Sequence, residues 1–341
     1  MHTTPGRSCM LGNTATELLP HDEAAGRVVR GAFGDLENAI EQAVWLARAV
    51  TTYIDEALKA LAAGDIDRAR EAVRGGGTPL TAALAEHLDD ARSGSVYDQP
   101  AAFEAFINGG GNVGLYQAVT EALGNLYARV RPSSLLDIGC GDGRALRPAL
   151  TVEQAPASVT LVEPSETLLD SAVRALDGFQ VDARHSRVEP FAAALPDDAV
   201  FDVAQSTFAL HTLPHEVRDE VLADLVGHVG VLAVVEFDVP DLPHASPEHR
   251  RFLAEAYERG LTEYDADRTL VAQGFLMPVL TGQLVPGATR ATWEQPASRW
   301  AEQVTRAGFT GVEVTRLHDY WWSPAFLLTA SGSPTATTPR R

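Results

Sequence analysis

The sequence is poor in cysteine and has no long apolar run. Its 341 residues include only 2 cysteines, Cys9 and Cys140, which excludes a disulfide framework and a cysteine-rich zinc site. No stretch has the length of a membrane-spanning helix, and residues 1–7 contain no apolar signal region, so we expect no membrane partner. A reducing compartment suits this cysteine content, and the expected location is cytoplasmic.

Positive charge is also scarce. Lysine and arginine number 27 against 46 acidic residues, which gives a formal net charge of −19. Such a chain repels phosphate backbones, and no stripe of basic residues with interleaved aromatics interrupts the acidic character. We therefore expect a small-molecule substrate and no nucleic-acid partner.

One glycine-rich stretch at residues 135–144, Leu-Leu-Asp-Ile-Gly-Cys-Gly-Asp-Gly-Arg, dominates the chain. An apolar run, an acid and three alternating glycines are typical of a buried strand, a tight turn and a helix. Glycine lets a ligand approach the backbone closely, and the helix N-terminus favours a negative group. The spacing is G-x-G-x-G, which differs from the dinucleotide-binding G-x-G-x-x-G.

This D-x-G-x-G-x-G form resembles motif I of class I S-adenosylmethionine (SAM) methyltransferases. The resemblance covers about residues 115–240 and implies a doubly wound α/β fold with a mostly parallel seven-stranded sheet, here with a helical N-terminal domain. It implies SAM as the cofactor. The motif I residues expected at the methionine end of SAM are Asp137, Gly139, Cys140, Gly141 and Gly143.

Further expected strands carry the other candidate residues. The strand at 159–163 ends in Glu163, whose carboxylate can accept hydrogen bonds from both ribose hydroxyls. A third strand is expected to end near 187–189, a fourth spans 201–206, and a fifth spans 231–237. The remaining cofactor candidates on these segments are Pro164, Glu189 near the adenine, and Gln205 and Ser206 at the strand end that faces the methyl group in the family. His211, at the end of the fourth strand, is the candidate base.

The rest of the chain divides by pattern. Residues 1–30 and 331–341 are expected to be disordered, 31–114 to form a helical cap, and 115–330 to form the SAM-binding domain with an insertion at about 239–295. Apolar residues recur every three or four positions from Leu36 to Leu61. Further helices are expected at 66–73, capped by Asp65, at 119–130 and at 296–307, with an antiparallel strand pair at 312–317 and 325–330.

The role of the cap stays open on sequence alone. It could close over the cofactor, or it could serve as scaffold or as the surface of a homodimer. Tyr97 and Tyr116 flank a linker with three glycines at 109–111, and both are candidates for contacts near the cofactor. The aromatic run at 318–322 suits core packing and a substrate-pocket wall equally well. No metal is expected, because His244 and His249 lack the spacing of a helical ligand pair.

The function expected from these features is SAM-dependent methyl transfer to a small molecule, in biosynthesis. One alternative is SAM chemistry without methyl transfer, such as intramolecular cyclisation to azetidine-2-carboxylate with release of methylthioadenosine. Another is a SAM-binding module without catalysis. Methylthioadenosine as the product indicates cyclisation, whereas S-adenosylhomocysteine (SAH) indicates methyl transfer.

Overall fold

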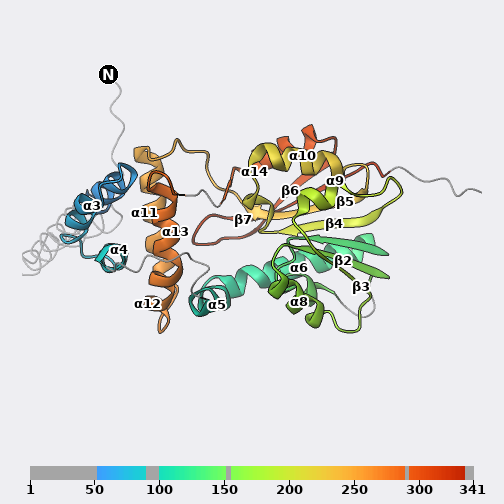
Figure 1. Cartoon of the computed structure of the whole chain (residues 1–341), viewed down its shortest axis with the longest axis horizontal. Helices are drawn as coiled ribbons and strands as arrows, with labels where there is room; N and C mark the ends of the chain where they lie inside the picture. Colours follow the sequence, from blue (N-terminus) through green and yellow to red (C-terminus); the bar gives the residue numbers. More distant parts are fainter. Residues whose placement is uncertain (1–51, 90–99, 151–154, 289–291, 335–341) are drawn as a thin grey trace, which may run out of the picture.

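The computed structural model describes residues 52–89, 100–150, 155–288 and 292–334. In this part of the chain, an α/β domain lies at one end of an elongated molecule and a block of helices at the other (Figure 1). The predictions for residues 1–30, for the first part of the 36–61 helix, for Tyr97 and for the end of the C-terminal tail lie outside the described residues.

The α/β domain contains one seven-stranded sheet with the order β3-β2-β1-β4-β5-β7-β6. The first five strands in sequence are parallel, whereas β7 pairs antiparallel with both β5 and β6. The doubly wound, mostly parallel sheet and the antiparallel terminal pair are confirmed. The strands are β1 Ser134–Ile138, β2 Ser158–Glu163, β3 Val181–His185, β4 Phe201–Thr207, β5 Val229–Phe237, β6 Thr310–His318 and β7 Ala325–Ser331.

Both faces of the sheet are covered by helices, which is why the central strands read as almost continuous apolar runs. Leu135 of β1 packs on one face, where three of the helices lie, and its neighbours Leu136 and Ile138 pack on the other. On the Leu135 face the helices are α6 Asn112–Val130, α7 Leu146–Ala149 and α8 Glu166–Ala175, and on the other α9 Val188–Ala193, α10 His215–Leu225 and α14 Ala297–Arg306.

The helical block combines segments that are far apart in the sequence. Helical residues 52–62, α3 (Ile66–Val73), α4 (Pro79–Asp89) and α5 (Pro100–Asn108) precede the sheet, whereas the other helices come from the insertion between β5 and α14. The insertion contributes α11 Pro247–Thr262, α12 Arg268–Val271, the π-helical turn η4 Ala272–Leu276 and α13 Met277–Leu284.

One apolar core joins the two sets of helices. Leu58 and Leu84 from the N-terminal set share it with Leu253 and Leu280 from the insertion. Polar contacts cross the same boundary: Arg250 pairs with Asp55 at 2.7 Å, and the amide of Leu80 donates to Glu258 at 3.1 Å. The insertion therefore completes the core of the helical cap. The predicted boundary between the cap and the SAM-binding domain stays a prediction.

One expected strand was misplaced. The third strand was expected to end near residues 187–189, but β3 ends at His185 and Glu189 lies in α9. Pro190 supplies the reason, because proline lacks the N–H that a strand ladder needs, whereas the first turn of a helix tolerates it. The predicted helix at 66–73 is confirmed with its Asp65 cap, whose side chain accepts from Arg68 N at 3.0 Å.

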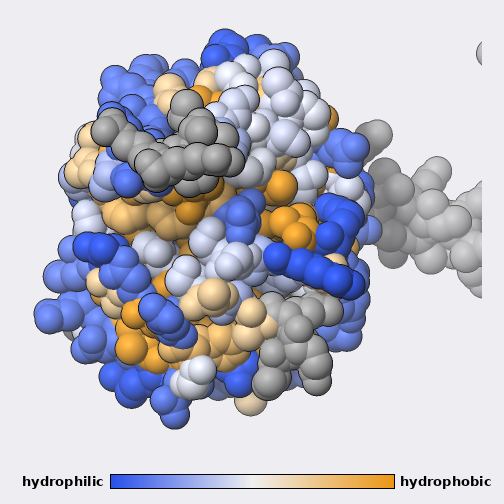
Figure 2. Space-filling view, turned by 90° about the vertical axis from the view of Figure 1, so that its right-hand side faces the viewer, coloured by the Kyte–Doolittle hydropathy of each residue, from blue (hydrophilic) through white to orange (hydrophobic). Residues whose placement is uncertain are grey.

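Figure 2 shows the end of the α/β domain that faces away from the helical block. Hydrophilic residues surround smaller hydrophobic areas on this face. Large exposed hydrophobic side chains of the described residues are scattered: Val200 lies in the loop before β4, and Val314 lies in β6. A homodimer stays a prediction.

Among the described helices, none combines the length and the apolar character that crossing a bilayer requires.

Candidate active site

The glycine turn after β1 has the geometry that its sequence predicts. Gly139 and Gly141 have φ values of 66° and 54°, in the left-handed region that other residues adopt at a cost. A Cβ on Gly139 would lie 2.3 Å from the Cβ of Ala209, in the loop after β4. A Cβ on Gly141 would meet nothing within 4 Å. The first glycine is therefore required by packing, while the second faces open space that a ligand can fill.

Two buried carboxyl groups flank this turn. Glu163, at the end of β2, accepts hydrogen bonds from Gly141 N at 3.0 Å and from Ser165 N at 2.9 Å. Asp137 is only 2 % exposed. Burial raises the pKa of Asp137 to about 7; the Gln205 side chain opposes this rise and the charge of Glu163 adds to it. A cation bound beside Asp137 would favour its charged form.

The end of β4 presents two buried polar residues, Gln205 and Ser206, followed by the half-buried Thr207. Within the described residues, Ser206 Oγ and Thr207 Oγ1 have no hydrogen-bond partner, whereas Gln205 Oε1 accepts from the Tyr127 hydroxyl and the Gln205 side chain also bonds to Asp137. A buried polar group without a partner costs about 1–3 kcal/mol. This strand end therefore favours a polar ligand that supplies the missing partners.

His211 lies in a short 3₁₀ turn, Leu210–Thr212, that follows β4 after Thr207, instead of at the strand end itself. Its Nδ1–H donates to Glu236 Oε2 at 2.8 Å, and its backbone N–H donates to Glu236 Oε1 at 3.1 Å. Both carboxylate oxygens of the buried Glu236 thus hold this one residue. The bond at Nδ1 fixes the tautomer, so that Nε2 carries the lone pair of the neutral ring.

The charges around His211 move its pKa in opposing directions. Burial lowers the pKa, but the charge and hydrogen bond of Glu236 and the charge of Glu294 raise it, and the net effect is a pKa above 6.5. Arg218 opposes the rise. That guanidinium is fully buried 3.9 Å from the ring centroid of Trp300, and burial lowers its own pKa to about 10.

Sequence reasoning missed Glu236 and Arg218. Glu236 ends the apolar run of β5 in the way that Glu163 ends β2, and a carboxylate at the end of a buried strand was the available signal. Arg218 lies within the amphipathic helix α10, where nothing in the spacing separates a buried arginine from a solvated one. Its position became visible only through the packing of α10 on α14.

Four aromatic rings form a continuous wall at this edge of the sheet. Phe208 stacks on Phe237 with centroids 4.5 Å apart, and Phe237 stacks on Tyr320 at 5.3 Å. Tyr116 meets Phe208 edge-on at 6.1 Å. Burial raises the pKa of Tyr116 to about 12, with nearby Arg144 opposing, so its hydroxyl stays neutral at physiological pH.

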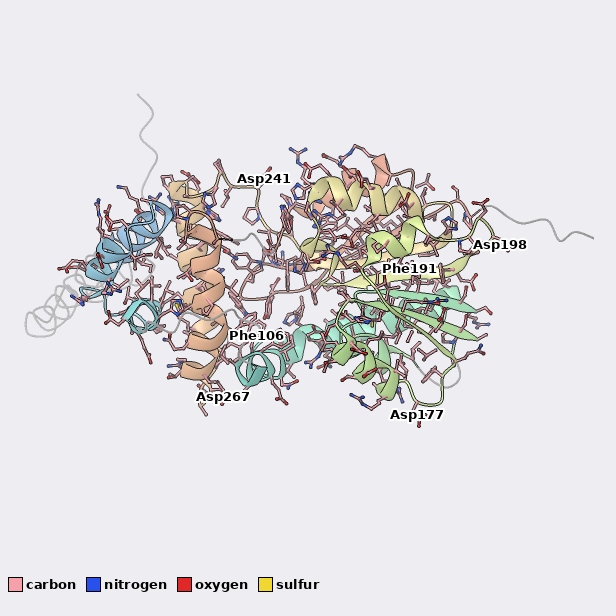
Figure 3. All side chains as sticks on the ribbon, viewed as in Figure 1. Phe106, Asp177, Phe191, Asp198, Asp241 and Asp267 are labelled. Carbon is pink, nitrogen blue, oxygen red and sulfur yellow. The ribbon has the colours of Figure 1, made fainter. Side chains whose placement is uncertain are left out.

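A cavity of about 1340 Å³ lies between this aromatic wall and the helical block. His211 and Tyr116 line it from the α/β domain, and Phe106 and Trp322 line it from the other side. Figure 3 labels Phe106 at the junction of the two parts. The glycine turn contributes no residue to the lining, so the cavity is space beyond the expected cofactor site. Trp321 and Trp322 are also buried in the helical core, so the 318–322 run both packs in the core and lines the cavity; its role as a substrate-pocket wall stays a prediction.

The predicted cofactor residues fall into three groups. The first meets around the ends of β1, β2 and β4: Asp137, Gly139, Cys140, Gly141, Gly143, Glu163, Gln205 and Ser206. Pro164 and Glu189 lie beyond these strands; the Pro164 carbonyl accepts from His185 Nε2 at 2.9 Å, and Glu189 pairs with Arg187 at 2.6 Å. Tyr116 instead lines the cavity. Contact of these residues with SAM stays a prediction.

The structure offers no metal site in the part of the chain that it describes, as no three His, Cys, Asp or Glu side chains cluster suitably. His244 and His249 line the cavity with ring centroids 5.8 Å apart. Each has a hydrogen bond within the fold: His244 Nε2 with the Gln283 carbonyl at 3.0 Å, and His249 Nδ1 with Ala245 N at 3.1 Å.

Comparison with known proteins agrees with this geometry. A family model described as "Methyltransferase domain" matches residues 135–229, from β1 to the start of β5. The strand order is that of the class I methyltransferase fold, and the family-model match lies within this part of the chain. No curated protein matches the chain.

Solved structures that resemble the chain do so at low identity. Magnesium protoporphyrin IX methyltransferase from Synechocystis PCC 6803 with bound SAM has 14 % identity and a TM-score of 0.41, over 65 % of this chain and 81 % of that one. An O-methyltransferase family protein from Burkholderia thailandensis has 14 % identity and a TM-score of 0.43, with 79 % and 60 % covered. The plantazolicin methyltransferase BpumL with SAH has 11 % identity and a TM-score of 0.45, with 74 % and 94 % covered.

Proposed function

We propose that the protein is a SAM-dependent methyltransferase that methylates an O–H or N–H group of a small molecule, with His211 as the general base. The single observation that carries this proposal is the loop after β4. Ala209 of this loop packs against the motif I glycine Gly139, and two residues later His211 lines the cavity. The loop thus connects the cofactor turn with the space for an acceptor.

The residues at the strand ends fit SAM. The methionine portion carries a carboxylate and an ammonium group, and its nucleoside carries a ribose diol. Asp137 would face the ammonium group, and Glu163 would accept hydrogen bonds from the diol. The open space at Gly141 would let the ligand contact the main chain of the turn. The unpartnered hydroxyl oxygens of Ser206 and Thr207 at the end of β4 support the same assignment, because a bound polar ligand would supply a partner there.

When bound, SAM supplies a methyl group already activated by a positively charged sulfur. The protein's own part is to orient the acceptor and to receive its proton. His211 Nε2 takes that proton, and Glu236, as a positioning residue, holds the ring by Nδ1 and stabilises the imidazolium that forms. In the balanced reaction the acceptor atom would lose its proton to His211 and gain the methyl group, and SAH would leave with the electron pair of the broken S–CH₃ bond.

The test is product analysis by mass spectrometry after incubation with SAM and a cell extract, then with the identified acceptor. SAH as the product supports methyl transfer. Methylthioadenosine would instead indicate cyclisation of SAM, and no turnover despite SAM binding would indicate a binding module.

The role of His211 has its own test. His211→Gln is expected to lower kcat about 10²–10⁴-fold, the usual contribution of a general base. An acceptor with a more acidic hydroxyl should recover part of the loss, because it needs less help to ionise. His228→Gln is the matched control, since His228 directly precedes β5, at the N-terminal end of that strand, and bonds the Ala199 carbonyl. Equal losses of kcat in both variants would refute the assignment of His211 as the general base.

A further inference from the structure

The cavity has two aromatic walls from different parts of the fold. The wall on the α/β side is the stack of Phe208, Phe237 and Tyr320. On the helical side, Phe106 stacks on Phe275 with centroids 4.0 Å apart, and both line the same cavity. Offset stacking of rings on such walls stabilises a complex beyond the burial of apolar area. Flat aromatic ligands are therefore favoured between them.

The size of the cavity separates acceptor classes. Ligand pockets usually have volumes of about 300–1000 Å³, and this one, at about 1340 Å³, is larger although the motif I turn is not part of it. A single-ring acceptor or an amino acid would leave most of the cavity filled with water. A ring system that extends from His211 toward the helical block would replace that water with apolar contact.

The charges of the lining disfavour an anionic acceptor. Its two arginines are already paired: Arg299 with Glu302 at 3.1 Å and Arg306 with Asp219 at 3.3 Å. The lining also contains the carboxylates of Asp241 and Glu294, and four histidines, each hydrogen-bonded within the fold: His211, His215, His244 and His249. A bound anion would have to compete for these guanidinium groups and would face two negative side chains.

Resting on the proposed methyltransferase function, we propose that the acceptor is a neutral aromatic compound of two or more rings that carries its O–H or N–H at one end. The rings occupy the space between Phe208–Phe237–Tyr320 and the helical block. The ionisable group lies at the His211 end. The cavity selects the size of the ring system and its lack of charge. It does not select a particular substituent.

Gly282 offers a way to shorten the cavity without disturbing its walls. It lies in α13 and lines the cavity, and a Cβ there would meet nothing within 4 Å. Gly282→Phe would therefore place a ring in open space, and helix propensity favours the replacement. Gly227→Phe is the matched control, because Gly227 also has open space at its Cβ but does not line the cavity.

The experiment uses two fluorescent probes with the same anilinonaphthalene body on the full chain. N-phenyl-1-naphthylamine is neutral, and 8-anilinonaphthalene-1-sulfonate carries one negative charge. We expect the neutral probe to saturate one site and to bind at least tenfold more tightly than the sulfonate. Gly282→Phe should weaken the neutral probe at least tenfold, and Gly227→Phe should change its Kd less than twofold.

The outcomes separate this inference from the proposed function. The proposed acceptor class would be overturned if the sulfonate bound more tightly than the neutral probe. It would also be overturned if Gly282→Phe left the Kd of the neutral probe unchanged. Calorimetric titration with SAM, run on the same three proteins, reports the cofactor site and the integrity of the variants. SAM binding without cavity-specific probe binding would refute the acceptor class alone, whereas cavity-specific probe binding without SAM binding would refute the methyltransferase function.

Discussion

The Glu236–His211 pair allows a quantitative prediction about stability and pH. Glu236→Gln keeps the shape of the side chain and an oxygen that can accept from His211, but it removes the charge. A hydrogen bond to a charged group contributes about 1.5–3 kcal/mol and a neutral one about 0.5–1.5 kcal/mol. Because Glu236 is 1 % exposed and the His211 side chain 15 %, solvent screens the pair little. We expect a loss of about 1–2 kcal/mol in the free energy of unfolding where His211 is protonated.

The sign of the pH dependence follows from the raised pKa of His211. A group whose pKa is higher in the folded than in the unfolded state stabilises the fold fully below its unfolded pKa, here about 6.5. That contribution disappears as the pH rises through the folded pKa. The difference in unfolding free energy between wild type and Glu236→Gln should therefore be largest near pH 6 and shrink toward pH 9. Loss of the charge opposite the buried Arg218 adds a cost that this pH range does not change.

The assay is urea unfolding of both proteins at several pH values between 6 and 9. Glu313→Gln, at an exposed position of β6, serves as control and should show no comparable pH dependence. A difference between wild type and Glu236→Gln that stays constant across the range, or grows with pH, would refute the ion pair. NMR titration of His211 would decide independently, since its pKa should fall in the variant.

Five further substitutions at four positions test other parts of the structure. Gly141→Val should weaken SAM binding at least tenfold in calorimetry while the protein stays folded, whereas Gly139→Ala should lower the thermal midpoint because its methyl group meets the loop after β4. Glu163→Ala should weaken SAM and SAH in parallel, and Glu163→Gln less so; unequal losses for the two ligands would contradict contact with their shared ribose. Arg250→Ala should destabilise the helical block by breaking its pair with Asp55, detected as increased proteolysis within α3 and α4 and not within the sheet.

The sheet was largely predictable because its central strands are buried on both faces. Runs such as 231–237 can bury their apolar side chains only between two helical layers. The motif at 137–143 fixes where β1 ends. The prediction of where β3 ends was wrong because β3 is an edge strand with mostly exposed residues, so apolar periodicity gave no boundary. There the backbone chemistry of Pro190 was the better guide.

The candidate site was predictable where one short motif supplied it and not where distant segments meet. Residues 135–144 contain the cofactor turn within one stretch, so spacing alone identified it. The cavity instead joins Phe106, Phe237 and Phe275, which are far apart in the sequence and share no periodicity. The partnership of His211 with Glu236 likewise depends on the neighbouring positions of β4 and β5 in the sheet, which only the topology defines.

The most direct test of the central claim is calorimetric titration of the full chain with SAM, SAH and NAD. The motif I geometry predicts binding of SAM and SAH at a single site, loss of both in Glu163→Ala, and no measurable binding of NAD. Tight binding of NAD, or absence of SAM binding to the folded wild type, would contradict the assignment of this chain as a SAM-dependent enzyme.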